Sequence, residues 1–236
     1  MADVTAADFR WDDYDGVLFD LDGVITPTAV IHEHAWAALF ADHDYSEADY
    51  LRYIDGKPRY DGVRSFLESR GITLPDGDPG DPPGDDTVAA LGNRKNQLFT
   101  EILEREGVDP YPGSQRVLDL LAERGVPAAI VSSSKNAKPV LAAAGLADRF
   151  DVVVDGVVSA ELDLPGKPQP DGYLLGARRL GTAPERTVVV EDASSGVAAG
   201  HNGSFAVTIG VDRGAGHETL LEHGATFVVD DLDELL

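Results

Sequence analysis

The feature that most constrains the fold is an alternation of short apolar runs with amphipathic helical segments, interrupted once. One apolar run lies at residues 16–20, and from Gly113 onward such runs alternate regularly with segments of helical periodicity. The runs are continuous and rich in Val and Ile, which is typical of strands buried on both faces of a parallel sheet. Beyond the first, the predicted strands are 127–131, 150–154, 187–190, 205–209 and 226–229, and the predicted helices are 115–124, 137–144, 172–180, 196–199 and 218–222.

The interruption carries helical periodicity and no strand pattern. Its apolar spacing predicts helices over 30–41, around 50–54, around 63–67 and over 88–106. Between Leu74 and Asp86, repeated Pro, Gly and Asp predict an exposed loop. We therefore predict an α/β fold with a doubly wound, Rossmann-like parallel-sheet core of residues 1–27 and 110–236, into which an all-α domain of residues 28–109 is inserted.

Composition narrows the classes of protein that fit. With 236 residues and 43% apolar content, the chain is long enough for one globular core and an insert. No run approaches the ~18 apolar residues of a membrane span, and the start does not resemble a signal peptide, so we expect a cytoplasmic protein. The net charge of −23 argues against binding nucleic acid or anionic membranes. It suggests a salt-adapted or simply acidic cytosol, although plain solubility is the favoured interpretation. The absence of cysteine excludes disulfides and thiolate sites. We expect a monomer.

Two carboxylates follow the first predicted strand directly. The run Gly16-Val17-Leu18-Phe19 leads into Asp20-Leu21-Asp22-Gly23. Ligands of an open α/β sheet bind beyond the carboxyl ends of its strands. Carboxylates crowded there repel one another unless a cation or a proton relieves them. An ordinary Asp-Gly turn after a buried strand is the alternative, so the other strand ends must be considered too.

Polar residues also follow later strands. The segment Ser132–Asn136 is a hydroxyl cluster that opens a helix, which suits an anion or a plain helix cap. Lys167, one of only five lysines, lies between Gly and Pro before a helix, and it could also be merely solvated. The pair Glu191-Asp192 ends another strand. If these acids face those of the first strand they form a hard-oxygen Mg²⁺ site, and otherwise they act as a capping device.

Taken in order, these four segments resemble the four motifs of the haloacid dehalogenase superfamily of phosphotransferases. The resemblance covers nearly the whole chain, because the helical insert is similar to the helical cap of that superfamily. It implies that Asp20 attacks phosphorus to form an aspartyl phosphate, and that Asp22 serves as general acid and base. It implies further that Ser132 and Lys167 bind the transferring phosphoryl oxygens. The implied Mg²⁺ site consists of Asp20, Asp22 through its backbone carbonyl, and Asp192, with Glu191 as a ligand or a neighbour of the ligands.

A closer resemblance is to the β-phosphoglucomutase-like subfamily and its hydrolase relatives. It rests on Val24-Ile25-Thr26-x-Thr28, His32, Ala35-Trp36, Arg94-Lys95-Asn96, Tyr111-Pro112-Gly113 and Ser132–Asn136. The chain departs from the subfamily at Pro27, where an acid is common, and in the segment 55–64, which matches only loosely. The substrate-binding residues implied are His32, Arg59 (with Arg64 as the alternative), Lys95, Ser133, Ser134, Lys135 and Asn136. Trp36 is expected in the core of the cap.

The resemblance also implies roles in the cap. His32 would couple cap closure to Asp22, and Lys95 would reach the sugar, whereas each could instead be a surface residue of its helix. The segment 134–136 would hold a second, non-transferring phosphate. The leading reading is a Mg²⁺-dependent mutase acting on a small phosphorylated sugar, β-glucose 1-phosphate to glucose 6-phosphate. A sugar phosphatase is the close alternative, and a non-catalytic binding protein or a dehalogenase is more distant.

Overall fold

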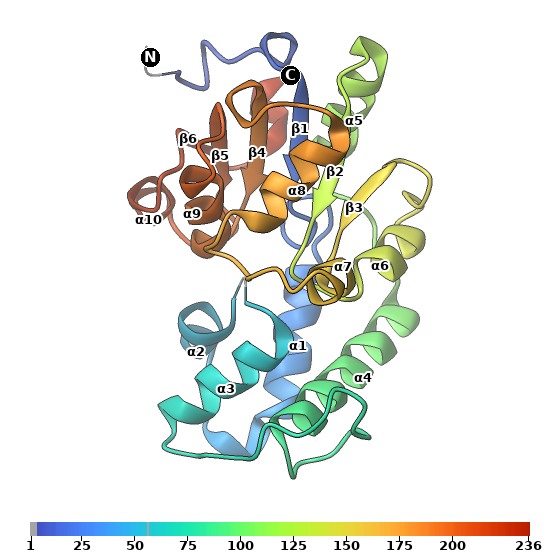
Figure 1. The fold of residues 1–236 in the computed structure, drawn as a ribbon, viewed down its shortest axis with the longest axis vertical. Helices are drawn as coiled ribbons and strands as arrows, with labels where there is room; N and C mark the ends of the chain where they lie inside the picture. The colour runs from blue at the N-terminus through green and yellow to red at the C-terminus, as the bar shows by residue number, and fades with distance from the viewer. Residues whose placement is uncertain (1–3, 56) are drawn as a thin grey trace.

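Six parallel strands form one sheet in the order β3-β2-β1-β4-β5-β6 (Figure 1). This computed structural model of the chain describes residues 4–55 and 57–236. The predicted parallel-sheet core is confirmed, and the observed strand ends differ from the predicted ones by no more than two residues. The strands are β1 (Gly16–Phe19), β2 (Ala128–Val131), β3 (Val152–Val154), β4 (Thr187–Glu191), β5 (Val207–Val211) and β6 (Phe227–Val229).

Helices cover both faces of this sheet, which is why its strands are apolar throughout. Val17 and Phe19 of β1 pack on one face against α5 (Pro112–Arg124) and α6 (Ala137–Ala143). Leu18 packs on the other face against α8 (Asp171–Leu180), beside α9 (Ser194–Asn202) and α10 (His217–Glu222). The alternation of side chains along each strand therefore builds two apolar layers around one sheet.

The register of the central strands brings their polar ends together. Phe19 of β1 is paired with Ile130 of β2 and with Val190 of β4. Because the three strands run in parallel, the residues that follow them meet at the same edge of the sheet. This edge carries Asp20 after β1 and Glu191 at the end of β4.

The helices between β1 and α5 form a separate group at the carboxyl edge of the sheet, at the bottom of Figure 1. They have an apolar cluster of their own, in which the ring centroids of Phe40 and Phe66 are 4.1 Å apart. Trp36 is buried in this cluster, as predicted. Within 28–109, the described residues contain no strand. The helices are α1 (Thr28–Leu39), α2 (Glu47–Asp49), a π-helix (Tyr50–Ile54), α3 (Arg59–Ser69) and α4 (Val88–Glu106).

Local structure differs from the prediction at two places. The segment 50–54, predicted as a separate helix, is a π-helix that continues directly from α2. Helix α7 (Gly156–Glu161) was not predicted, since it is short and its sequence is valine-rich. Its start depends on Asp155, whose carboxylate accepts the N–H groups of Val157 and Val158. The Pro- and Gly-rich run at 74–86 contains neither helix nor strand, as predicted.

Segments near the two ends of the chain, around Trp11 and Leu235, contact each other. Trp11, in a short 3₁₀ helix (Trp11–Asp13), is buried and donates a 3.0 Å hydrogen bond to the carbonyl of Leu235. Further 3₁₀ turns are Ala41–His43, Pro184–Arg186 and Leu232–Leu235. Within residues 4–55 and 57–236, no helix combines the length and apolar character needed to cross a membrane.

Candidate active site

A cavity of about 500 Å³ lies between the carboxyl edge of the sheet and the inserted helices. Its walls come from both parts of the chain, the sheet edge on one side and α1, α3 and α4 on the other. Apart from Arg64, the alternative to Arg59, it brings together the candidate site residues predicted from the sequence: Asp20, Asp22, His32, Arg59, Lys95, Ser132, Ser133, Ser134, Lys135, Asn136, Lys167, Glu191 and Asp192.

Asp20 and Lys167 form an ion pair on the floor of this cavity. Asp20 follows β1, is only 6% exposed, and accepts a hydrogen bond of 2.5 Å from Lys167 Nζ. Burial raises the pKa of the Asp20 carboxyl well above its usual value, although Lys167 opposes this shift. Burial alone would lower the pKa of Lys167, but the carboxylates of Asp20 and Glu191 hold it well above its usual range. Lys167 is therefore a fixed positive charge next to Asp20.

Glu191 orients Lys167 and has little capacity for further contacts. Its Oε1 accepts from Lys167 Nζ at 2.5 Å and from the hydroxyl of Tyr173 at 2.9 Å. Its Oε2 accepts the backbone N–H groups of Asp192 and Ala193 at 2.9 and 3.0 Å. This packing requires glycine at 196, because a Cβ there would lie 1.6 Å from Oε1. With four donors already bound, Glu191 is suited to positioning its neighbours.

Three carboxylates at this edge could hold a metal ion. Asp20, Glu191 and Asp192 each offer an oxygen, and these oxygens lie within 4.8 Å of one another. Such a set of hard oxygen donors fits Mg²⁺. Since both oxygens of Glu191 are engaged, Asp20 and Asp192 are the carboxylates left to bind a cation. Gly23 approaches Asp192 so closely that a Cβ would lie 1.8 Å from its Oδ2, and its φ of +89° also favours glycine.

The carboxylate of Asp22 lies outside this set and faces the inserted helices. Its Oδ1 accepts a hydrogen bond from Thr28 and lies 3.5 Å from Nε2 of His32. Its Oδ2 accepts from Ser132 at 3.5 Å. Burial raises the pKa of Asp22, but the contacts with His32 and Thr28 outweigh burial and hold it below its usual value. The two aspartates of one turn thus have different surroundings, Asp20 beside Lys167 of the core and Asp22 beside Thr28 and His32 of the inserted helices.

His32 and Lys95 form a buried polar pair above Asp22. Lys95 Nζ hydrogen-bonds Nδ1 of His32, and it lies 5.0 Å from the ring centroid of Trp36 and 5.1 Å from that of Phe99. The ring of His32 stacks on Phe99 at 4.1 Å. Burial lowers the pKa of both groups. Lys95 is only 3% exposed and the side chain of His32 only 13%, so both face the cavity and neither is a surface group of its helix.

A second cationic group lies where the inserted helices meet the core. Arg59 Nη2 donates a 2.7 Å hydrogen bond to Oδ1 of Asn96, and Lys135 lies 5.4 Å from the ring centroid of Tyr60. Among residues 4–55 and 57–236, no carboxylate lies within ion-pair distance of Arg59 or Lys135. Arg64, the alternative to Arg59, is instead paired with Asp61 and Asp76 at the surface, outside the cavity.

The serine segment after β2 is a chain of local turns. Ser132 Oγ accepts the N–H of Ser134 at 3.0 Å, and Ser134 Oγ accepts the N–H of Asn136 at 3.1 Å. Asn136 precedes α6 and donates through its side-chain amide to Oδ1 of Asn96 at 2.6 Å. Ser133 also lines the cavity. The segment therefore provides caps for its own backbone and polar groups for the cavity at once.

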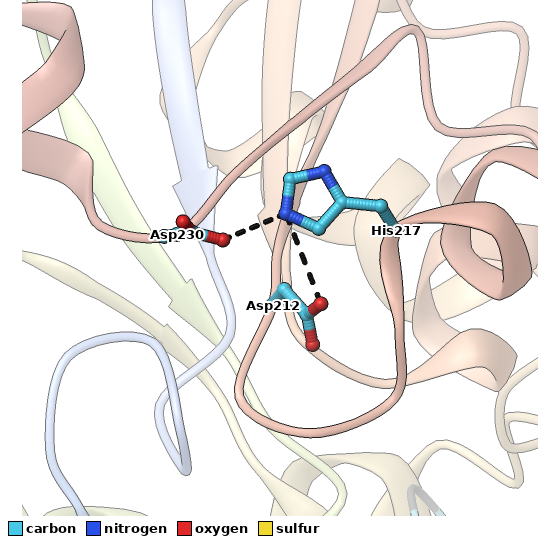
Figure 2. Close-up of side chains that lie close together, drawn as sticks. All are labelled: Asp212, His217 and Asp230. Carbon is cyan, nitrogen blue, oxygen red and sulfur yellow. Dashed lines mark hydrogen bonds and ion pairs between the residues drawn. The ribbon is translucent and has the colours of Figure 1, made fainter.

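A group of two carboxylates and a histidine lies elsewhere on the molecule, at the ends of β5 and β6 (Figure 2). His217 Nε2 lies 2.7 Å from Oδ1 of Asp230 and 3.8 Å from Oδ2 of Asp212. Asp212 also accepts the N–H groups of Gly214 and Gly216, so it closes the loop between β5 and α10. These contacts give the three side chains a structural role, which is to hold the loop between β5 and α10 in place at the surface.

Sequence reasoning missed the roles of Tyr173, which lines the cavity, and of Asn96, which contacts two residues that line it. Tyr173 follows Lys167 by six positions, yet in sequence it is indistinguishable from any core aromatic residue of α8. Asn96 appeared only as part of a resemblance, without a role. Each acts through a partner far along the chain, which local patterns do not reveal.

Comparisons with known proteins agree with this geometry. Residues 14–203 match the family model described as haloacid dehalogenase-like hydrolase. The chain is 47% identical to a β-phosphoglucomutase of Mycobacterium tuberculosis, over 93% of this chain and 90% of that protein. It is 35% identical to hexitol phosphatase A of Escherichia coli, over 78% of this chain and 77% of that protein. Among solved structures, a β-phosphoglucomutase from Clostridium difficile has a TM-score of 0.78 at 26% identity, covering 94% of this chain and 93% of that one.

The family model spans most of the chain. The two sequence relatives match this chain over most of their own length. The fold, the order of the four motifs and these matches point to one family of enzymes. The chain therefore belongs to the haloacid dehalogenase-like hydrolase family.

Proposed function

We propose that this protein is a Mg²⁺-dependent phosphomutase that converts β-glucose 1-phosphate to glucose 6-phosphate through an aspartyl phosphate on Asp20. One observation carries the proposal. Two groups suited to phosphate line the same cavity, Lys167 beside Asp20 and the unpaired cations Arg59 and Lys135. In a chain of net charge −23, cations without carboxylate partners are suited to binding an anionic ligand. A mutase needs two phosphate sites, whereas simple hydrolysis needs one.

The residues of the sheet edge would carry out phosphoryl transfer. Asp20 and Asp192, with the backbone carbonyl of Asp22, would hold Mg²⁺. When bound, the ion supplies positive charge that lets a phosphate dianion enter a cavity rich in carboxylates. As Asp20 attacks phosphorus, the bond to the sugar oxygen breaks and Asp22, in its protonated form, gives its proton to that oxygen. In the return step the accepting sugar hydroxyl attacks the aspartyl phosphate, gives its proton to the Asp22 carboxylate, and Asp20 is released. Lys167 and Ser132 bind the oxygens of the transferring group.

The inserted helices would control when this chemistry occurs. We propose that residues 28–109 move as a cap about Thr26-Pro27-Thr28 and the segment before Tyr111. The N–H of Tyr111 donates a 2.9 Å hydrogen bond to the carbonyl of Ile25. This contact joins the two segments that connect the cap to the core and supports a common hinge for both. Since Asp22 contacts Thr28 and His32, closure would set the position of the general acid as well as exclude water.

All the groups of this proposed site come from one chain. We therefore propose that the protein acts as a monomer. We also propose a cytoplasmic location and, as the substrate, a small phosphorylated sugar, which fits a cavity of about 500 Å³.

The deciding assay mixes β-glucose 1-phosphate with a trace of glucose 1,6-bisphosphate and follows glucose 6-phosphate and free phosphate together. Glucose 6-phosphate should accumulate with little free phosphate, and Arg59→Ala should slow this conversion strongly. Arg64→Ala is the matched control and should have little effect, because Arg64 lies outside the cavity. Free phosphate without glucose 6-phosphate, or indifference to Arg59→Ala, would contradict the mutase.

A phosphatase acting on a sugar phosphate is the second candidate. The similarity to hexitol phosphatase A supports it, as does the fact that hydrolysis would use the same Asp20, Asp22 and Lys167. The same assay separates the two functions, since a phosphatase releases phosphate from β-glucose 1-phosphate and needs no bisphosphate.

A further inference from the structure

Asn96 joins the inserted helices to the core through a single oxygen atom. Its Oδ1 accepts a hydrogen bond from Arg59 Nη2 at 2.7 Å and another from the side-chain amide of Asn136 at 2.6 Å. Arg59 begins α3 and Asn96 lies on α4, whereas Asn136 precedes α6 of the core. The two donors are thus aimed at one point from the two sides of the cavity that they line.

The chemical nature of this acceptor matters because it leaves the charge of Arg59 intact. Many of the other arginines of this acidic chain are paired with carboxylates, as for Arg64 with Asp76 at 2.9 Å and Arg70 with Asp49 at 2.8 Å. Arg59 instead meets a neutral carboxamide. A guanidinium has five N–H donors and a primary amide has two, so both partners keep donors for a ligand after binding Asn96.

We propose that Asn96 is a positioning residue that presets Arg59 and Asn136 to bind the second, non-transferring phosphate of a hexose bisphosphate. The inference rests on the proposed function, and it assigns to Asn96 the selectivity for ligands with two phosphates. An acceptor must hold the flexible guanidinium in place without competing for its charge. A carboxamide does this, whereas a carboxylate would act as an internal anion in place of the ligand.

Replacing Asn96 by its isosteric acid separates positioning from charge. In Asn96→Asp, the side chain keeps its shape and both hydrogen bonds, but it neutralises Arg59. In Asn96→Ala, Arg59 keeps its charge and loses its orientation. Gln97→Glu is the matched control, because it adds the same charge at the next, exposed position of α4, where the side chain contacts Glu101 rather than Arg59.

The first measurement is calorimetric titration with glucose 1,6-bisphosphate, with every variant made in an Asp20→Asn background so that no phosphate is transferred. We expect Asn96→Asp to weaken binding roughly ten- to hundredfold, as for loss of a charge-assisted contact, and Asn96→Ala to weaken it by less. Gln97→Glu should change the Kd by no more than about twofold, as is usual for an exposed charge.

The second measurement is hydrolysis of acetyl phosphate by the same variants with Asp20 intact. This donor has one phosphoryl group and no second anion, so the loss of kcat/KM in Asn96→Asp should be much smaller than its loss of affinity for the bisphosphate, and Gln97→Glu should stay within about twofold of the unaltered protein. If Asn96 had only a structural role, its replacement would impair bisphosphate binding and acetyl phosphate hydrolysis alike. A loss confined to the bisphosphate therefore indicates positioning.

The outcomes are distinguishable. If the unaltered site binds the bisphosphate and Asn96→Asp binds it equally well, the role of Asn96 is refuted while the proposed function stands. Equal losses for the bisphosphate and for acetyl phosphate would also refute it, because the effect would be general. If the Asp20→Asn protein with Asn96 intact does not bind the bisphosphate at all, the proposed function fails together with the inference.

Discussion

The hydroxyl of Tyr173 donates a 2.9 Å hydrogen bond to Oε1 of Glu191, the same oxygen that accepts from Lys167 at 2.5 Å. Tyr173 is buried on α8, and Lys167 lies 5.1 Å from the centroid of its ring. Tyr173 therefore holds Glu191, which orients Lys167, and its ring also packs against Lys167. The position of the Lys167 ammonium beside Asp20 thus depends on α8, a helix that contributes no reacting group.

Tyr173→Phe should weaken this arrangement without changing the core packing. A buried charged acceptor loses one donor, so we expect the free energy of unfolding to fall by about 1–3 kcal/mol. Lys167 would be held less firmly, and we expect KM for the phosphorylated substrate to rise severalfold. Urea unfolding and steady-state kinetics test the two effects. Tyr14→Phe is the control, since Tyr14 stacks on Phe9 and its hydroxyl has no hydrogen bond among the described residues. Equal effects of both substitutions would count against the role of Tyr173.

Gly23→Ala should lower activity as well as stability, a larger effect than its left-handed backbone conformation alone explains. A Cβ at Gly23 would lie 1.8 Å from Asp192 Oδ2, whereas a Cβ at Gly125, whose φ is also positive, would meet nothing within 4 Å. Gly125→Ala should cost roughly 1–2 kcal/mol of stability through its left-handed backbone and leave activity unchanged. Gly23→Ala should in addition lower kcat/KM by about a hundredfold, because Asp192 is displaced. Equal activity of the two variants would show that the close approach is unimportant.

Asp20→Asn should abolish the phosphoenzyme while the fold is retained. The substitution removes one of several crowded carboxylates, and Lys167 keeps its contact with Glu191. Acid-stable, hydroxylamine-sensitive phosphate should therefore disappear. Its persistence would mean that another residue is the nucleophile.

Asp22→Asn should separate capture of phosphate from proton transfer. The variant should still take phosphate from acetyl phosphate, whose leaving group needs no acid. Turnover of sugar phosphates should fall by roughly 10²–10⁴, the usual contribution of a general acid. Parallel losses on both substrates would contradict this role.

Chelation should stop catalysis and leave the fold intact. The proposed cation site consists of Asp20 and Asp192 at one edge of the sheet, so losing the ion would remove the charge that admits phosphate. We expect no turnover in excess EDTA and full recovery on addition of Mg²⁺, with circular dichroism unchanged. Full turnover in the chelator would refute the metal requirement.

The contact of Asp49 with Arg70 should make the stability of the inserted helices depend on pH in the acid range. The hydrogen bond from Arg70 Nη2 at 2.8 Å, together with those from Ser46, lowers the pKa of Asp49 from 3.8 to about 2. Because the folded pKa is lower than the unfolded one, the stabilisation is present above pH 3.8 and is lost as the pH falls toward about 2. Asp49→Asn should therefore lower the urea midpoint near neutral pH, and the difference should vanish in strong acid.

Prediction from the sequence succeeded where a local pattern and the geometry of a parallel sheet were sufficient. Each central strand is a continuous apolar run, so its end can be located to within two residues. Since parallel strands end at one edge, Asp20, Ser132 and Glu191 had to be neighbours once their strands were adjacent. The long amphipathic helix α4 was predicted with the same bounds as observed, because its apolar spacing is sustained over 19 residues.

The rest depended on contacts between segments that are distant in sequence. Arg59 meets Asn96 across 37 positions, and Asn136 meets the same amide across 40. Nothing local distinguishes Asn96 from any other polar residue of α4, or Tyr173 from a core aromatic residue. Which strands form the sheet, and which residues stand at their ends, therefore follows from the sequence, because period and order along the chain encode both. Only the packing of the inserted helices on the core decided which donor meets which acceptor in the cavity, because hydrogen bonds between side chains depend on how separate helices are placed against one another.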